Sequence, residues 1–73
     1  MNEDLVIKPG VRMALKNDPK VTGTITKMGY GYLIWEADQP FTIEYNGKIH
    51  SATRIVFRSS REARQKLDFI DES

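Results

Sequence analysis

Three aromatic residues stand close together near the middle of the chain: Tyr30, Tyr32 and Trp35. Aromatic rings can stack on nucleic-acid bases while cationic side chains nearby contact phosphates. The basic residues that precede this aromatic group in the sequence are Arg12, Lys16, Lys20 and Lys27. These residue types together predict a binding surface that combines stacking rings with phosphate-contacting cations.

A second basic group lies near the C-terminus, where Arg61 and Arg64 are three residues apart. Residues at this spacing share one face of a helix. Such a face can grip phosphates or an acidic helix. The alternative is that both arginines only keep an exposed helix face solvated.

The sequence offers little for catalysis or metal binding. It has no cysteine and a single histidine, His50, whereas a zinc site or a catalytic centre needs several converging groups. Glu36, Asp38 and Glu44 read as a solvated edge, and the Gly29–Gly31 loop lacks the lysine of a phosphate loop. We expect no enzymatic activity, no cofactor, no metal and no small-molecule substrate.

The charges are segregated along the chain. Residues 8–66 hold all 11 basic residues and 5 acidic ones, a net charge of +6, while five acidic residues at the two ends bring the total to +1. Those end residues are Glu3, Asp4, Asp68, Asp71 and Glu72. A basic body attracts phosphate or an acidic protein surface, and the alternative is solubilising charge scattered over a small domain.

The 73 residues suffice for one domain, and 40% hydrophobic with 29% charged residues is typical of a globular one. No apolar run approaches the length of about 18 residues that spans a bilayer, and the first residues are acidic where a signal peptide would be basic. We therefore expect a single cytoplasmic domain without a membrane partner.

Turn-forming residues punctuate the chain at the spacing of short antiparallel strands. The segments between the turns favour strands by composition and alternation; they are residues 11–15, 22–28, 32–36 and 41–45. Gly23, inside the second segment, indicates a bulge or a tight bend. The sequence thus predicts a mainly β fold.

The dipeptide Asn46-Gly47 is the strongest hairpin signal in the chain. A two-residue turn there sets Ile43 opposite His50 and leaves Ile49 on the face away from Ile43. The expected fifth strand is therefore short and bulged near His50. A tight turn over residues 51–54 should follow before residues 55–57 rejoin the sheet.

The C-terminal part changes to a helical pattern. Ser59 lies three residues before Glu62, as in a capping box, and Ala63, Leu67 and Ile70 recur at helical spacing. We expect a short helix from Ser60 to Phe69.

Several short motifs resemble the small SH3-like barrels of the KOW and Tudor type. They are Lys8-Pro9-Gly10-Val11-Arg12-Met13, Asp18-Pro19, Thr22-Gly23-Thr24-Ile25 and Tyr32-Leu33-Ile34-Trp35-Glu36. The resemblance covers residues 8–57. It implies a five-stranded antiparallel barrel over residues 9–57, after an N-terminal lead over residues 1–8 and before a C-terminal helix and acidic end over residues 58–73.

The family pattern implies that Leu33 and Trp35 point into the barrel. Tyr32 and Ile34 then point outward and form, with Tyr30, a small exposed apolar patch of the kind that usually marks an interface. The alternative is that the C-terminal helix covers Tyr32 and Ile34.

Barrels of this type seldom catalyse reactions, and the resemblance implies a binding module. The expected function is that of an accessory or regulatory protein, of the kind phages encode, that docks on RNA polymerase, the ribosome or nucleic acid itself. The alternative is a protein-protein adaptor that makes no nucleic-acid contact. The candidate binding residues are Arg12, Lys16, Lys20, Lys27, Tyr30, Tyr32, Ile34, Arg61 and Arg64.

Overall fold

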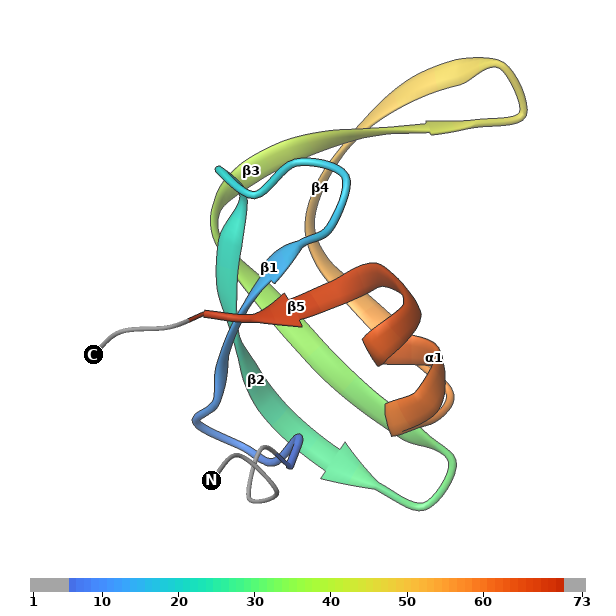
Figure 1. Cartoon of the computed structure of the whole chain (residues 1–73). Coiled ribbons are helices and arrows are strands. Elements are labelled where there is room, and N and C mark those ends of the chain that lie inside the picture. Colours follow the sequence, from blue (N-terminus) through green and yellow to red (C-terminus); the bar gives the residue numbers. More distant parts are fainter. Residues whose placement is uncertain (1–5, 71–73) are drawn as a thin grey trace.

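The computed structural model describes residues 6–70 and shows one antiparallel sheet with a short helix (Figure 1). The elements are β1 (Arg12–Leu15), β2 (Thr22–Gly29), β3 (Tyr32–Tyr45), β4 (Lys48–Phe57), α1 (Ser60–Lys66) and β5 (Leu67–Phe69). The strand order in the sheet is β4-β3-β2-β1-β5. The predicted fold class, mainly β with five antiparallel strands and a short C-terminal helix, is confirmed.

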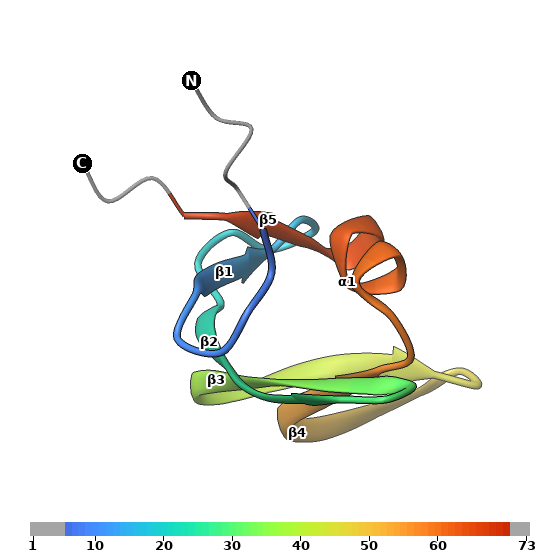
Figure 2. The same cartoon turned by 90° about the horizontal axis from the view of Figure 1, so that it is seen from below.

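The sheet curls so that β1 and β5 face β3 and β4 across the core (Figure 2). Between residues 6 and 70, no ladder pairs the two edge strands β4 and β5 with each other. Helix α1 stands at this opening and contacts both edge strands. The helix therefore covers the side of the barrel that the strands leave open.

The core is built around Trp35, which is fully buried. Its ring lies edge-on to Phe41, with ring centroids 5.6 Å apart. Its Nε1 donates a hydrogen bond of 3.1 Å to the carbonyl of Met13, so the one polar atom of the ring is satisfied. Leu33 is buried beside it. The predicted inward orientation of Leu33 and Trp35 is thus correct.

Gly23 allows β2 to pass close to this ring. A Cβ atom at Gly23 would lie 2.7 Å from Cε2 of Trp35 and 2.8 Å from Cα of Ala37, which is closer than any side chain tolerates. The register irregularity of β2 lies further along, between Ile25 and Lys27. The glycine therefore serves close packing, and the bulge predicted near it is three residues away, at Thr26.

The predicted division of residues 32–45 into two strands is wrong, because β3 runs through them without a break. The ladder with β4 shifts register between Glu36 and Phe41, whose partners are Arg54 and Ala52. Residues 37–40 thus face the single residue Thr53, and these four residues form a large bulge instead of a turn.

Beyond this bulge the ladder continues as a projecting hairpin, residues 41–52, which we call the hairpin arm (Figure 1). Asn46 and Gly47 form its turn with φ of 54° and 77°, as predicted. The short, bulged fifth strand and the tight turn over residues 51–54 are wrong, because β4 is continuous. Both features were predicted because the hairpin register puts Ile49 on the face away from Ile43. Ile49 is 75% exposed, so that position needs no apolar partner.

The predicted helix begins as expected but ends early. Ser59 Oγ accepts a hydrogen bond of 3.1 Å from the backbone of Glu62, as in a capping box, yet α1 stops at Lys66. The next three residues pair with β1, with Leu67 opposite Leu15. Pairing satisfies backbone groups at the open edge of β1, so the expected helix end is a strand, and it lies outside the residues 9–57 assigned to the barrel.

The described end of the predicted N-terminal lead belongs to the body, because Ile7 is buried in the core. Of the acidic end residues, Asp68 lies in β5. Glu3, Asp4, Asp71 and Glu72 lie outside the described residues.

Candidate binding surface

The outer side of β2, β3 and β4 carries the predicted patch. The ladder registers place Lys27 opposite Ile34 and Ile34 opposite Val56, so these three side chains form one row across the sheet. The neighbouring residues Leu33 and Phe57 are buried on the other side. Because side chains alternate along a strand, the row points away from the core. Ile34 is half-buried, while Lys27 and Val56 are exposed.

The two tyrosines extend this row toward the turn between β2 and β3. Tyr32 lies opposite Gly29, and its ring covers that glycine so closely that a Cβ there would lie 2.8 Å from Cζ of Tyr32. Tyr30 stands in the turn and is fully exposed. The turn is completed by Gly31, whose φ of 77° suits glycine.

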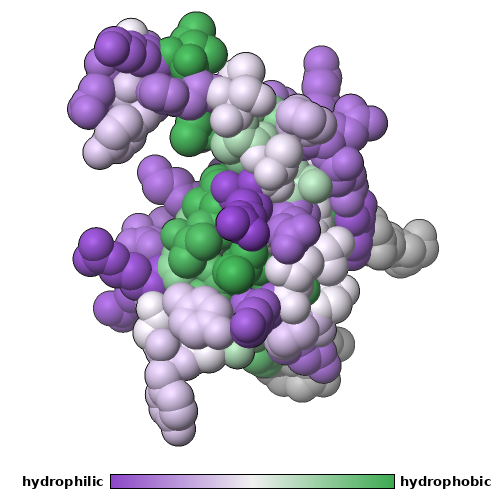
Figure 3. All heavy atoms as spheres, turned by 180° about the vertical axis from the view of Figure 1, so that it is seen from behind, coloured by the Kyte–Doolittle hydropathy of each residue, from purple (hydrophilic) through white to green (hydrophobic). Residues whose placement is uncertain are grey.

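We call this surface the tyrosine face and define it as Lys27, Tyr30, Tyr32, Ile34 and Val56. Figure 3 looks at this side of the molecule and shows an apolar area in its middle with polar groups around it. The patch predicted from Tyr30, Tyr32 and Ile34 is thus brought together, with Lys27 beside it.

The alternative, in which the C-terminal helix covers Tyr32 and Ile34, is wrong. Leu67 is buried in the core and pairs with Leu15 on β1. Helix α1 lies at the opening between β4 and β5, on the inner side of the sheet (Figure 2). The outer face of β3 is therefore left uncovered by α1.

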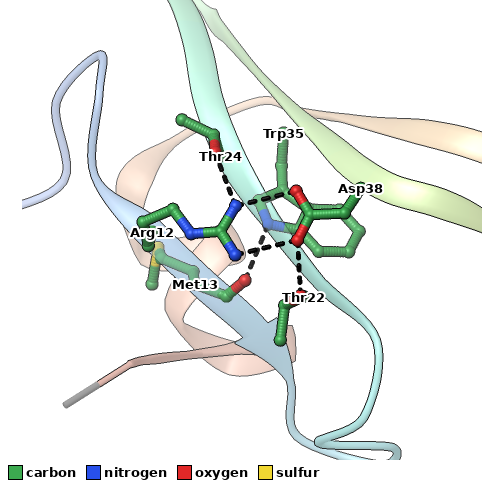
Figure 4. A network of polar contacts seen from close by, with 6 residues as sticks. All are labelled: Arg12, Met13, Thr22, Thr24, Trp35 and Asp38. Atoms are coloured by element: carbon green, nitrogen blue, oxygen red, sulfur yellow. Dashed lines mark hydrogen bonds and ion pairs between the residues drawn. The ribbon is translucent and has the colours of Figure 1, made fainter. Parts of the chain in front are cut away.

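Arg12, one of the predicted binding residues, forms an ion pair that is part of the fold. Its guanidinium forms a bidentate ion pair with Asp38, with nitrogen–oxygen distances of 2.7 and 2.8 Å (Figure 4). It also donates to Oγ1 of Thr24 at 3.1 Å, while Thr22 donates its hydroxyl to Asp38 at 2.6 Å. Two donors fix this carboxylate, and the guanidinium that was expected to meet phosphate is engaged by Asp38 in a partly exposed ion pair.

These hydrogen bonds lower the pKa of Asp38. The hydrogen bonds from Arg12 and then from Thr22 lower it from its ordinary value of 3.8 to about 2. The carboxylate lies in the bulge of residues 37–40, from which the hairpin arm departs. The ion pair therefore ties the base of the arm to β1.

Lys16 and Lys20 lie in the connection between β1 and β2, at the far end of β2 from Tyr30. The eight residues of β2, at about 3.3 Å each, separate its ends by about 23 Å. The backbone N–H of Lys16 donates to the carbonyl of Lys66 at 2.9 Å. Lys20 lines a small polar pocket of about 320 Å³ beside Asp38. Neither lysine joins the tyrosine face.

Arg61 and Arg64 are exposed on α1. The guanidinium of Arg64 lies over the ring of Phe69, 5.9 Å from its centroid, which is cation–π geometry. Arg61 has no such contact among residues 6–70. Both arginines are on the helix that covers the barrel opening, so the structure places them on a different element from the tyrosines.

Sequence reasoning missed two residues beside Ile34. Val56 is 57% exposed, and Arg54 lies opposite Glu36 in the neighbouring row of the outer face. The run Ile55-Val56-Phe57 is apolar throughout, which hides the alternation that would have marked Val56 as outward. Arg54 was assigned to a turn, so its position in the ladder could not be found.

Residues 6–70 contain no group of three or more histidine or acidic side chains that could hold a metal ion. None of the helices in that part of the chain has the length and apolarity to cross a bilayer.

The comparisons with known proteins identify no relative. No protein-family model matches the chain, and no curated protein or solved structure matches it either.

Proposed function

We propose that the protein is a small, non-catalytic binding module that docks on nucleic-acid machinery by binding single-stranded nucleic acid with its tyrosine face. The observation that carries the proposal is the fully exposed ring of Tyr30 beside Tyr32, with Lys27 on the same side of the sheet. The resemblance of residues 8–57 to KOW and Tudor barrels supports a binding role of this kind.

The surface has the two components that single-strand binding requires. Bases stack on aromatic rings with about 1–3 kcal/mol per base, and cations along the groove meet the phosphates. Tyr30 and Tyr32 supply rings, while Lys27 and Arg54 supply cations on the outer face. Two rings and few cations predict weak binding that falls as salt rises.

The second candidate is a protein-protein adaptor, and the exposure of Val56 favours it. Val56 and Ile34 are aliphatic and lie side by side in the centre of the tyrosine face. Aliphatic side chains gain little from phosphate or base contacts but bury well against another protein. Docking of this kind would depend little on salt.

Fluorescence anisotropy with a labelled single-stranded oligonucleotide at several salt concentrations tests the proposal. We expect log affinity to fall linearly with log salt, with a slope of about −0.7 for each neutralised phosphate. Lys27→Glu should reduce both the affinity and the slope. Lys20→Glu makes the same charge change about one strand length away and serves as the matched control, with affinity within about twofold of wild type.

Absence of binding at low salt would refute the proposal, and equal losses in the two lysine variants would show a general charge effect. An affinity pull-down before and after nuclease treatment distinguishes the protein-protein adaptor from the nucleic-acid-binding module. Partners retained after nuclease treatment only while Ile34 and Val56 are intact would support the adaptor.

A further inference from the structure

A groove runs between the hairpin arm and the body of the barrel, with a volume of about 700 Å³. Figure 3 shows the arm standing off the body with a notch below it. The groove is bordered by the arm, by the β1–β2 connection, by β4 and by α1. Its volume is within the range of about 300–1,000 Å³ of ligand-binding clefts.

The walls of the groove are largely apolar. The arm contributes Ile43 and Tyr45, which share the side of the sheet occupied by buried Phe41. Tyr45 is 65% exposed, because the core ends at Phe41 and nothing within residues 6–70 covers the ring. The body contributes the half-buried side chains of Leu15 and Ile55. Two apolar surfaces thus face a space that apolar side chains would fill.

The charges around the groove are acidic, unlike those of the rest of the body. The charged lining residues are Asp18, Glu44, Glu62 and Lys66, a net charge of −2. Of these, Glu44 borders the groove from the side of the arm opposite to Ile43 and Tyr45. Neither Asp18 nor Glu44 forms an ion pair within the described part of the chain. Glu62 accepts a hydrogen bond of 2.9 Å from the backbone of Arg58. An occupant with cationic side chains is therefore favoured.

The groove also follows a free strand edge. Strand β4 is the last strand of the sheet, so its backbone groups on the side away from β3 have no strand partner among residues 6–70. Exposed edges of this kind accept an extended peptide as an additional strand. Main-chain hydrogen bonds would give affinity, while the apolar walls and acidic rim would select the side chains.

We infer that this groove, here named the acidic groove, binds an extended segment of a partner protein in which apolar residues alternate with lysine or arginine. The ends of this chain do not fit that description, because Glu3, Asp4, Asp71 and Glu72 would bring acidic groups to an acidic rim. The inference is independent of the nucleic-acid function, since no residue of the tyrosine face except Val56 lines the groove.

The test is an NMR titration of the full chain with a short synthetic peptide in which lysine alternates with valine. We expect saturable shifts of the backbone amides of Ile43, Tyr45, Ile55 and Gln65. Asp18→Asn combined with Glu44→Gln should weaken the affinity about tenfold, because the two substitutions remove two of the three acidic charges that line the groove. Glu36→Gln, on the outer face, is the matched control and should leave the affinity within about twofold.

A peptide with glutamate in place of lysine should give no shifts at the same concentrations. Circular dichroism of the Asp18→Asn, Glu44→Gln variant, expected to match wild type, keeps a loss of binding from being confused with unfolding. Three results would overturn the inference: no saturable shifts with the lysine peptide, equal weakening by Glu36→Gln, or the same shifts appearing with protein concentration alone. The last result would show a second copy as the occupant.

Discussion

The ladder between β3 and β4 has two halves, both paired as antiparallel strands, that differ in the burial of their side chains. In the body half, Trp35 pairs with Ile55 and is fully buried. In the arm half, Tyr45 pairs with Lys48 and Ile43 with His50, and all four are exposed. Both halves alternate as strands do. The difference shows that burial here comes from what packs across the sheet. For the body this is β1, β5 and α1, whereas within residues 6–70 the arm faces only an open groove.

The comparison indicates that the body half stabilises the fold, whereas the arm half mainly presents exposed side chains. An isolated two-stranded hairpin is only marginally stable in water, so the body must hold the arm. The apolar side chains Ile43 and Tyr45 of the arm are exposed. The tyrosine face lies on the body half, where the inner residues supply the stability and the outer residues remain available.

Truncating the centre of the body half should have the largest effect. Trp35→Ala removes the ring that contacts Phe41 and lies against Gly23. We expect a loss of about 3–5 kcal/mol in the free energy of unfolding, which for a domain of this size removes most or all of the stability. Urea unfolding followed by circular dichroism measures it.

The matched change in the arm half is Tyr45→Ala, also an aromatic truncation. We expect a change in unfolding free energy of less than about 0.5 kcal/mol, as for other exposed positions. A loss in Tyr45→Ala comparable to that in Trp35→Ala would contradict the division of the ladder into a stabilising half and an exposed half.

An intermediate effect is expected at the junction of the two halves, where Arg12 binds Asp38. The pKa of Asp38 is lowered in the folded state from 3.8 to about 2. Its contribution to stability is therefore fully present above about pH 4 and is lost as the pH falls toward 2. Urea unfolding of wild type and Asp38→Asn between pH 6 and pH 2 tests this. The difference between the two proteins should shrink as the pH falls, and a constant difference would show that the ion pair does not stabilise the fold.

Local turn chemistry made part of the fold predictable. The φ values at Asn46 and Gly47 follow from residues that tolerate this conformation. The capping box at Ser59 and Glu62 is also a local signal. Each of these features depends on neighbours within a few residues, which is why the sequence reveals them.

The missed features depend on contacts distant in sequence. Leu67–Phe69 has a helical pattern, yet pairing with β1, more than fifty residues earlier, makes it a strand. The arm was missed because Ile49 was assumed to need burial.

At the candidate site, the resemblance to KOW and Tudor barrels implied the aromatic patch, and of the cations on this face Lys27 was predicted while Arg54 was not. Proximity in sequence suggested that Arg12, Lys20 and Lys27 lie together, but β2 separates Lys20 from Tyr30. The ion pair of Arg12 with Asp38 joins residues 26 positions apart. The acidic groove arises only where the arm, α1 and the β1–β2 connection meet, and no single segment carries a signal for it.

The most direct test compares two exposed tyrosines, Tyr30 on the tyrosine face and Tyr45 in the arm. Binding of the labelled single-stranded oligonucleotide is measured for Tyr30→Ala and Tyr45→Ala, together with the unfolding midpoint of each. We expect Tyr30→Ala to lose about tenfold in affinity, the value of one stacked base, with an unchanged midpoint. Tyr45→Ala should bind as wild type does. Wild-type affinity in Tyr30→Ala, or an equal loss in both variants, would contradict the assignment of binding to the tyrosine face.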